Sequence, residues 1–192
     1  MENIALCDME SAIEFLMENS VEINVKSSYV SGSDGVIKEY TVTASTEIHD
    51  EPKIIAEATI YAIDSAFLEY DDVINYADDI SQGLYDMVSE VFTNRKTKSK
   101  SKLFYDEETW TTDSIIYVET FEIKKEFRGQ GYGTAVAMEM ANQLFHRGDD
   151  VILVPFAIED NKNPMAHKRV KSFWETIGFN QIGSSNYYKY TY

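Results

Sequence analysis

The stretch IKKEFRGQGYGTAVAMEMANQLF, residues 123–145, decides the fold, because a strand end, a glycine-rich turn and an amphipathic helix follow one another in it without a gap. Apolar and aromatic side chains alternate in SIIYVETFEI, residues 114–123, which predicts a strand. Apolar residues then recur at helical spacing and predict a helix with one buried stripe, formed by Ala135, Met138, Ala141, Leu144 and Phe145. The predicted order is therefore strand, glycine turn, helix.

The turn between the strand and the helix contains Gly129, Gly131 and Gly133. The first turn of a helix offers unpaired N–H groups and the positive end of the helix dipole, and glycines let a phosphate come close to the backbone. This combination predicts a pyrophosphate-binding loop. The alternative is a turn that only packs the helix on the sheet, and it is less favoured because three glycines within five residues cost backbone entropy.

Known glycine motifs narrow the choice of ligand. A nucleoside-triphosphate loop needs a lysine after its last glycine and a dinucleotide fingerprint needs GxGxxG, and the turn has neither. The pattern RxxGxG does fit, with Arg128, Gly131 and Gly133, and it resembles the acetyl-CoA-binding loop of the GNAT superfamily of N-acetyltransferases. FWETIGF, residues 173–179, is similar to the family's segment in which the last helix runs into a glycine and an aromatic residue. The resemblance covers residues 113–182, and the N-terminal half only by strand order.

The resemblance implies an α/β (α+β) fold with a mixed, mostly antiparallel central sheet of about six to seven strands, flanked by helices. It also implies a single GNAT-like domain over residues 1–192, with 1–94 as the acidic, acceptor-side half and 113–192 as the acetyl-CoA-binding half. One departure is an extra helix, predicted by helical spacing over residues 71–94. It stands between the third and fourth strands, where a typical member of the family has only a hairpin, and Gly83 makes a bend in it plausible.

The other elements follow from periodicity and turn residues. Period-two alternation predicts strands and helical spacing predicts helices over these ranges: strands at 21–30, 36–48 and 53–63, helices at 9–18 and 164–177, and a closing hairpin over 179–192. DVILVPFAI, residues 150–158, predicts a strand buried on both faces. Pro155 cannot donate a ladder hydrogen bond, so this strand should splay from its neighbour there or simply end.

The charge of the chain is unevenly distributed. Residues 1–94 contain 20 acidic and three basic residues, whereas residues 95–192 contain 13 acidic and 14 basic ones. An acidic surface repels phosphate backbones, so nucleic acid is not expected as a partner and a cationic acceptor is favoured. The alternative is that the excess acid only keeps the protein soluble. RKTKSKSK, residues 95–102, predicts a solvated loop, with a contact to coenzyme phosphates as the weaker alternative.

Several classes of protein are disfavoured by what the sequence lacks. Cys7 is the only cysteine, which excludes a disulfide framework, and the three histidines have no spacing typical of a metal site, so no metal is expected. The first 19 residues carry five acidic residues and no basic one, and no apolar run approaches the length that spans a membrane. We therefore expect a cytoplasmic protein with no membrane partner, and a homodimer stays open.

The resemblance assigns a coenzyme-binding set. Backbone N–H groups of the turn would bind the pyrophosphate of acetyl-CoA, and main-chain groups of Phe121 and Ile123 would bind pantetheine and the thioester oxygen. Trp174 takes the place of the family's tyrosine and would pack on the coenzyme arm. The implied set is Phe121, Ile123, Arg128, Gly129, Gln130, Gly131, Tyr132, Gly133, Thr134, Asn163 and Trp174.

The catalytic expectations concern a base and an acid for transfer of an acetyl group to a small-molecule or peptide amine. Presenting a lysine-like amine neutral at pH 7 costs roughly 4 to 5 kcal/mol, so such an acceptor needs a base. Glu119 and Glu122 are the candidates, on opposite faces by alternation. Glu119 is preferred because it would share an apolar face with Tyr117, Phe121 and Ile123, which makes a carboxylate more basic. The alternative is that both glutamates are ordinary exposed strand positions.

The general acid must come from elsewhere than the last helix, because the indole of Trp174 is no useful proton donor. Tyr188 on the closing hairpin is the candidate, with Tyr187, Tyr190 and solvent as alternatives. Two rival functions remain: a non-catalytic interaction protein whose acidic half binds a basic protein, and an acidic mimic of nucleic acid.

Overall fold

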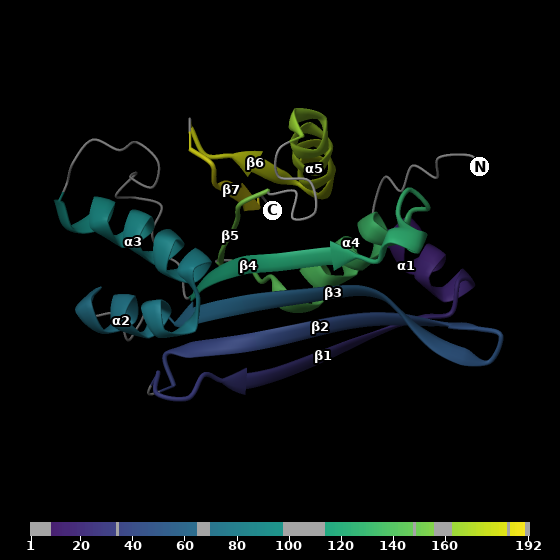
Figure 1. Ribbon diagram of the computed structural model, residues 1–192, viewed down its shortest axis with the longest axis horizontal. Coiled ribbons are helices and arrows are strands. Elements are labelled where there is room, and N and C mark those ends of the chain that lie inside the picture. The colour runs from purple at the N-terminus through teal and green to yellow at the C-terminus, as the bar shows by residue number, and fades with distance from the viewer. Residues whose placement is uncertain are drawn as a thin grey trace.

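A seven-stranded sheet runs through the chain in the order β1-β2-β3-β4-β5-β7-β6 (Figure 1). The computed structural model describes residues 9–33, 35–64, 70–97, 114–147, 149–155, 163–183 and 185–190, with the backbone alone at 70–72 and 91–97. The strands are β1 (Val21–Tyr29), β2 (Ile37–Ile48), β3 (Glu51–Asp64), β4 (Ser114–Ile123), β5 (Asp150–Leu153), β6 (Phe179–Gln181) and β7 (Tyr188–Tyr190). The helices are α1 (Met9–Glu18), α2 (Tyr70–Ile80), α3 (Gln82–Thr97), α4 (Tyr132–Leu144) and α5 (Pro164–Ile177).

Among the described strands, β4 and β5 are the one neighbouring pair that runs parallel. β1 to β4 form an antiparallel series, β4 and β5 run parallel, and β7 pairs antiparallel with both β5 and β6. The prediction of a mixed, mostly antiparallel sheet flanked by helices is confirmed.

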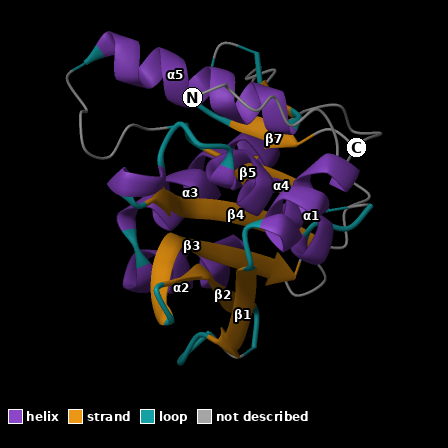
Figure 2. Ribbon diagram, turned by 90° about the vertical axis from the view of Figure 1, so that its right-hand side faces the viewer, coloured by secondary structure: helices purple, strands orange, loops and turns teal. Residues whose placement is uncertain are grey.

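Helices cover both faces of the sheet (Figure 2). On one face, which we call the α3 face, Tyr61 and Tyr117 of the sheet pack with Leu84, Met87 and Val88 of α3. On the other face, the α4 face, buried sheet residues pack with α4 and α5, among them Ile116, Val118, Ala137, Met140 and Trp174. α1 joins the α4 face at the far end of the sheet, against Ala44, Ile55 and Ala135.

The range 71–94, predicted to be a helix with room for a bend at Gly83, forms two helices. The break falls at Ser81, between Ile80 and Gln82, and Gly83 lies inside the first turn of α3. The Ser81 hydroxyl accepts a hydrogen bond from the Leu84 N–H at 3.0 Å, which is the N-cap geometry of a new helix. A side chain that caps α3 therefore ends the run of α2.

The pairing of β4 with β5 is short. It covers Ile115–Val118 and Asp150–Leu153, while β4 continues to Ile123. Figure 1 shows β5 rising away from β4 as β4 runs on. β5 ends two residues before Pro155, which fits both alternatives for that proline, and residues 156–158 of the predicted strand lie outside the described residues. Of the predicted basic loop, residues 95–97 belong to α3 and residues 98–102 are not described.

We predict that the aromatic cluster under α5 is a main source of stability. Phe179 is fully buried, with ring centroids 5.2 Å from Trp174 and 5.3 Å from Tyr190. Phe179→Ala should lower the free energy of unfolding by about 3 to 5 kcal/mol because it leaves a cavity. Urea denaturation measures this, with Tyr29→Ala as the control, since Tyr29 is 65% exposed. Equal losses in the two variants would contradict the assignment.

Candidate functional site

The glycine turn lies at the surface, between the end of β4 and the start of α4. A short 3₁₀ helix, Lys125–Phe127, links it to the strand. Gly129 and Gly131 have φ angles of 72° and 93°, in the left-handed region that favours glycine. Residues 128–130 are exposed and residues 131–134 are half-buried. The turn therefore meets solvent rather than being enclosed in the sheet packing.

The first turn of α4 supplies backbone donors at this surface. Its first helical hydrogen bond is from the Ala135 N–H to the Gly131 carbonyl, at 3.1 Å. The amides of Tyr132, Gly133 and Thr134 thus precede the helical ladder, and the N-cap residue Gly131 has no side chain to bond them. A helix N-terminus with this set of donors suits an anion such as a diphosphate.

Two of the glycines also allow close packing. A Cβ atom at Gly131 would lie 3.2 Å from Cε2 of Phe15 on α1, and one at Gly133 would lie 3.3 Å from Cγ1 of Ile123. Nothing lies within 4 Å of a Cβ built at Gly129. Gly131 and Gly133 therefore allow close packing of neighbouring side chains, and this does not conflict with an exposed backbone.

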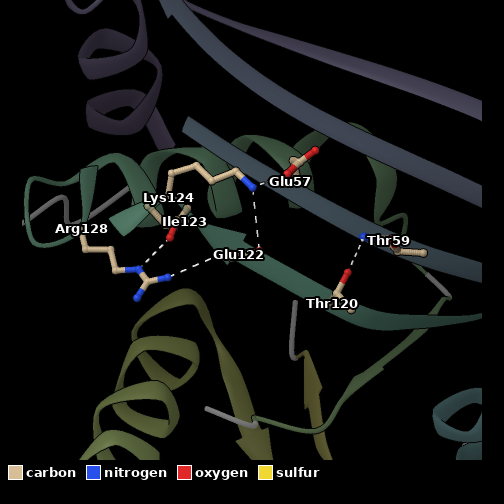
Figure 3. Close-up of polar contacts among 7 residues, drawn as sticks. All are labelled: Glu57, Thr59, Thr120, Glu122, Ile123, Lys124 and Arg128. Carbon is tan, nitrogen blue, oxygen red and sulfur yellow. Dashed lines mark hydrogen bonds and ion pairs between the residues drawn. The ribbon is translucent and has the colours of Figure 1, made fainter. Parts of the chain in front are cut away.

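Charged side chains gather where β4 ends (Figure 3). Arg128 donates from Nε to the Ile123 carbonyl at 2.7 Å, and its Nη2 lies 3.8 Å from Glu122. Lys124 lies 2.5 Å from Glu57 and 3.9 Å from Glu122, and its hydrogen bond to Glu57 raises the pKa of the lysine. The candidate base Glu122, 43% exposed, thus belongs to a network of surface ion pairs.

Glu119 is the extra residue of a β-bulge in β4. Thr120 pairs with Thr59 and Val118 pairs with Ile60, so nothing on β3 opposes Glu119. The Thr59 N–H donates to the side-chain oxygen of Thr120 at 3.1 Å (Figure 3). A bulge of this kind turns a side chain out of the regular alternation.

The bulge contradicts two expectations about which face of the sheet the side chains of β4 lie on. Phe121 packs on the α4 face with Val118, whereas Tyr117 packs on the α3 face, where it and Glu119 approach Gly83. Glu119 therefore does not share a face with Phe121 and Ile123. Alternation beyond the bulge also returns Glu122 to the side of Glu119, so the expected opposition of the two glutamates is wrong.

The Glu119 carboxylate is held by hydroxyl groups on the α3 face. It accepts hydrogen bonds from the Ser81 hydroxyl and from Tyr61. A Cβ atom on Gly83 would lie 3.1 Å from Oε1 of Glu119 and 3.2 Å from the Tyr117 hydroxyl. Tyr61, Ser81 and Gly83 were missed at the level of sequence, because they come from other elements than the motif strand.

Three tyrosines on the α3 face keep their protons well above neutral pH. Burial raises the pKa of Tyr117, and the charges of Glu119 and Asp86 raise it further. Burial also raises the pKa of Tyr61, helped by Glu119 and Glu39, and that of Tyr187, helped by Glu90. The α3 face thus combines neutral hydroxyl groups with carboxylates.

The remaining predicted residues lie on the α4 face or beside α5. Trp174 is 5% exposed and its ring centroid is 5.3 Å from Phe121, which also stacks on Phe173. Asn163 caps α5 by accepting from the Met165 N–H at 3.0 Å. Tyr188 is 2% exposed within the core of the α4 face, so Tyr187, not Tyr188, is the hairpin tyrosine near Tyr117.

Comparison with known families agrees with this geometry. Residues 109–188 match the sequence model of the FR47-like protein family. The match covers slightly less than half of the chain, and the FR47-like family is related to the GNAT superfamily of N-acetyltransferases. A comparison with curated proteins found no match for the chain.

In the part of the chain that the structure describes, no helix is long and apolar enough to cross a membrane. Among the same residues, no group of three or more His, Cys, Asp or Glu side chains is arranged to hold a metal ion.

We predict that the buried tyrosines weaken the fold in alkali. Their pKa values in the folded protein lie above the ordinary value of 10.0, so the folded state keeps protons that the unfolded state has lost above about pH 10. Stability should therefore be constant up to about pH 9 and fall as the pH rises beyond 10. Tyr117→Phe should lose about 1 kcal/mol less than the wild type between pH 9 and pH 11, measured by urea denaturation.

Tyr29→Phe is the matched control, because Tyr29 is exposed on the edge strand β1. Its pH dependence should follow that of the wild type. A Tyr117→Phe curve parallel to both would show that the Tyr117 hydroxyl is not held protonated by its surroundings.

Proposed function

We propose that the protein is an acyl-CoA-dependent N-acetyltransferase that transfers an acetyl group to the primary amine of a cationic small molecule or peptide. One observation carries the proposal: an exposed turn with two left-handed glycines leads from β4 into the N-terminus of α4. The relation of residues 109–188 to acetyltransferases adds independent support.

Acetyl-CoA would be bound by two neighbouring features. Amides of residues 129–134 would bind its diphosphate, for the reasons of helix geometry and dipole given above. Its pantetheine arm would lie along the last residues of β4, Glu119–Ile123, which continue past the last pair with β5. Arg128, the exposed cation of the turn, is tied to the Ile123 carbonyl and would orient that end of the strand.

The chemistry requires an amine without its proton. In the proposed reaction the amine nitrogen attacks the thioester carbonyl carbon, its proton passes to a carboxylate, and the carbon–sulfur bond breaks to release the thiolate. Glu119 is the proposed base, because it stands at the bulge with two hydroxyl groups holding its carboxylate. The thiolate takes its proton from water, since Trp174 cannot supply one and Tyr188 is buried.

A cationic acceptor fits the charges on the α3 face. The carboxylates that act on its tyrosines come from three elements, with Glu39 on β2, Asp86 and Glu90 on α3, and Glu119 on β4. They would attract a polyamine or a basic peptide and repel an anionic substrate.

The rival hypothesis is a non-catalytic protein that binds a basic partner through its acidic half. The observation that favours it is Trp174, which fills the position of the family's tyrosine with a buried indole. Consumption of the thioester distinguishes the two hypotheses, because only the enzyme releases a free thiol from acetyl-CoA when an amine is supplied.

The coenzyme site can be tested by calorimetric titration with acetyl-CoA. Gly131→Val should weaken binding at least about 10-fold, because a β-branched residue is strained at a φ of 93° and its Cβ would press on Phe15. Gly32→Val is the matched control, with a φ of 83° and open space around it, far along the chain from the turn. Equal affinity in Gly131→Val, Gly32→Val and the wild type would contradict the assigned turn.

The base can be tested with Glu119→Gln and a panel of amines that contains spermidine, a lysine peptide and an uncharged α-amine ester. The variant should lose about 10²- to 10⁴-fold in kcat with the lysine peptide, because glutamine accepts no proton. Its Kd for acetyl-CoA should stay within about twofold, since the diphosphate donors lie on the turn. Unchanged kcat would remove the role of Glu119.

A further inference from the structure

The start of α3 holds the side chain of Glu119 through a hydrogen bond from Ser81. Ser81 uses one oxygen twice, as a donor to Oε1 of Glu119 and as an acceptor from the Leu84 N–H at 3.0 Å. The N-cap of α3 is thus bonded to a carboxylate on β4.

The absence of a side chain at Gly83 leaves room for the Glu119 carboxylate beside α3. Gly83 is helical, not left-handed, so backbone conformation does not require glycine there. A Cβ atom would stand 3.1 Å from Oε1 of Glu119, which is closer than most real Cβ contacts. The glycine therefore keeps space for the carboxylate, although it weakens the helix relative to alanine.

Tyr61 completes the arrangement from β3. Its phenol keeps its proton at neutral pH, and it lies close enough to Glu119 for that carboxylate, after burial, to raise the pKa of Tyr61. Glu119, on a long and otherwise mobile side chain, is thus held between a strand residue and a helix cap. A carboxylate fixed in this way costs less ordering when the acceptor arrives.

We infer that Ser81 and Gly83 are positioning residues that aim Glu119 at the acceptor amine, an inference that rests on the proposed acetyltransferase activity. Neither residue touches substrate in this account. They act through Glu119, so their removal should lower kcat and leave the affinity for acetyl-CoA unchanged.

Ser81→Gly and Ser81→Thr form the decisive pair. Glycine is nearly as good as serine at an N-cap but has no hydroxyl to donate, whereas threonine keeps both functions. We expect Ser81→Gly to lose about 10- to 100-fold in kcat while Ser81→Thr stays within about threefold of the wild type. The melting temperature of both should stay within about 2 °C of the wild type.

Gly83→Ala tests whether the space beside the Glu119 carboxylate is needed for activity. Alanine is the better helix former, so its melting temperature should not fall, yet its methyl group displaces the carboxylate and should lower kcat about 10-fold. A residue with a merely structural role would show the reverse, lower stability with unchanged kcat per folded molecule.

The double variant Ser81→Gly/Glu119→Gln separates the inference from the proposed function. If Ser81 acts through Glu119, the double variant is no slower than Glu119→Gln alone. Additive losses, or full activity of Ser81→Gly in an active enzyme, overturn the positioning role alone. A wild type that binds acetyl-CoA but consumes none with any amine overturns the proposed function, and the inference fails with it.

Discussion

The pairing of β3 with β4 contains one residue too many, and this bulge at Glu119 governs the arrangement of the site. Up to Val118, even-numbered residues of β4 face α4, and from Phe121 onward odd-numbered residues do. The change of phase lets one strand supply a carboxylate to the α3 face and an aromatic ring to the α4 face within three positions. Without the extra residue, Glu119 and Phe121 would point the same way.

The order strand, glycine turn, helix could be predicted from the sequence because each of those elements is specified by local periodicity. The bulge could not be predicted, since the residues of SIIYVETFEI still alternate and the extra residue exists only relative to β3. The break at Ser81 was missed for a related reason: a serine inside a helical pattern reads as a neutral residue until its oxygen is seen to cap Leu84. Local patterns thus gave the elements, whereas contacts between them decided the directions of the side chains.

Trp174, which the resemblance aligns with a tyrosine, lies in the core of the α4 face. It belongs to a cluster of rings with Phe121, Phe173 and Phe179, at centroid distances of 5.0 to 5.3 Å, and each contact is edge-on. A buried tyrosine hydroxyl and a buried indole N–H both need a hydrogen-bond partner, and the indole adds the larger apolar area. Aromatic packing at this position therefore strengthens the α4 face, whereas the tyrosine hydroxyl groups beside Glu119 lie on the α3 face.

The start of α3 brings the acidic half of the chain, residues 1–94, into contact with Glu119 in the other half. Ser81 and Tyr61 belong to the acidic half of the chain, while Glu119 and the glycine turn belong to the other half. The bonds at Glu119 join the halves across the β3–β4 pairing, at the strand that leads into α4. A shift of α3 relative to β4 would therefore disturb the carboxylate before it disturbed the turn. The hydrogen bonding of Glu119 and the conformation of the glycine turn are then separable, because the first depends on α3 and the second on the start of α4.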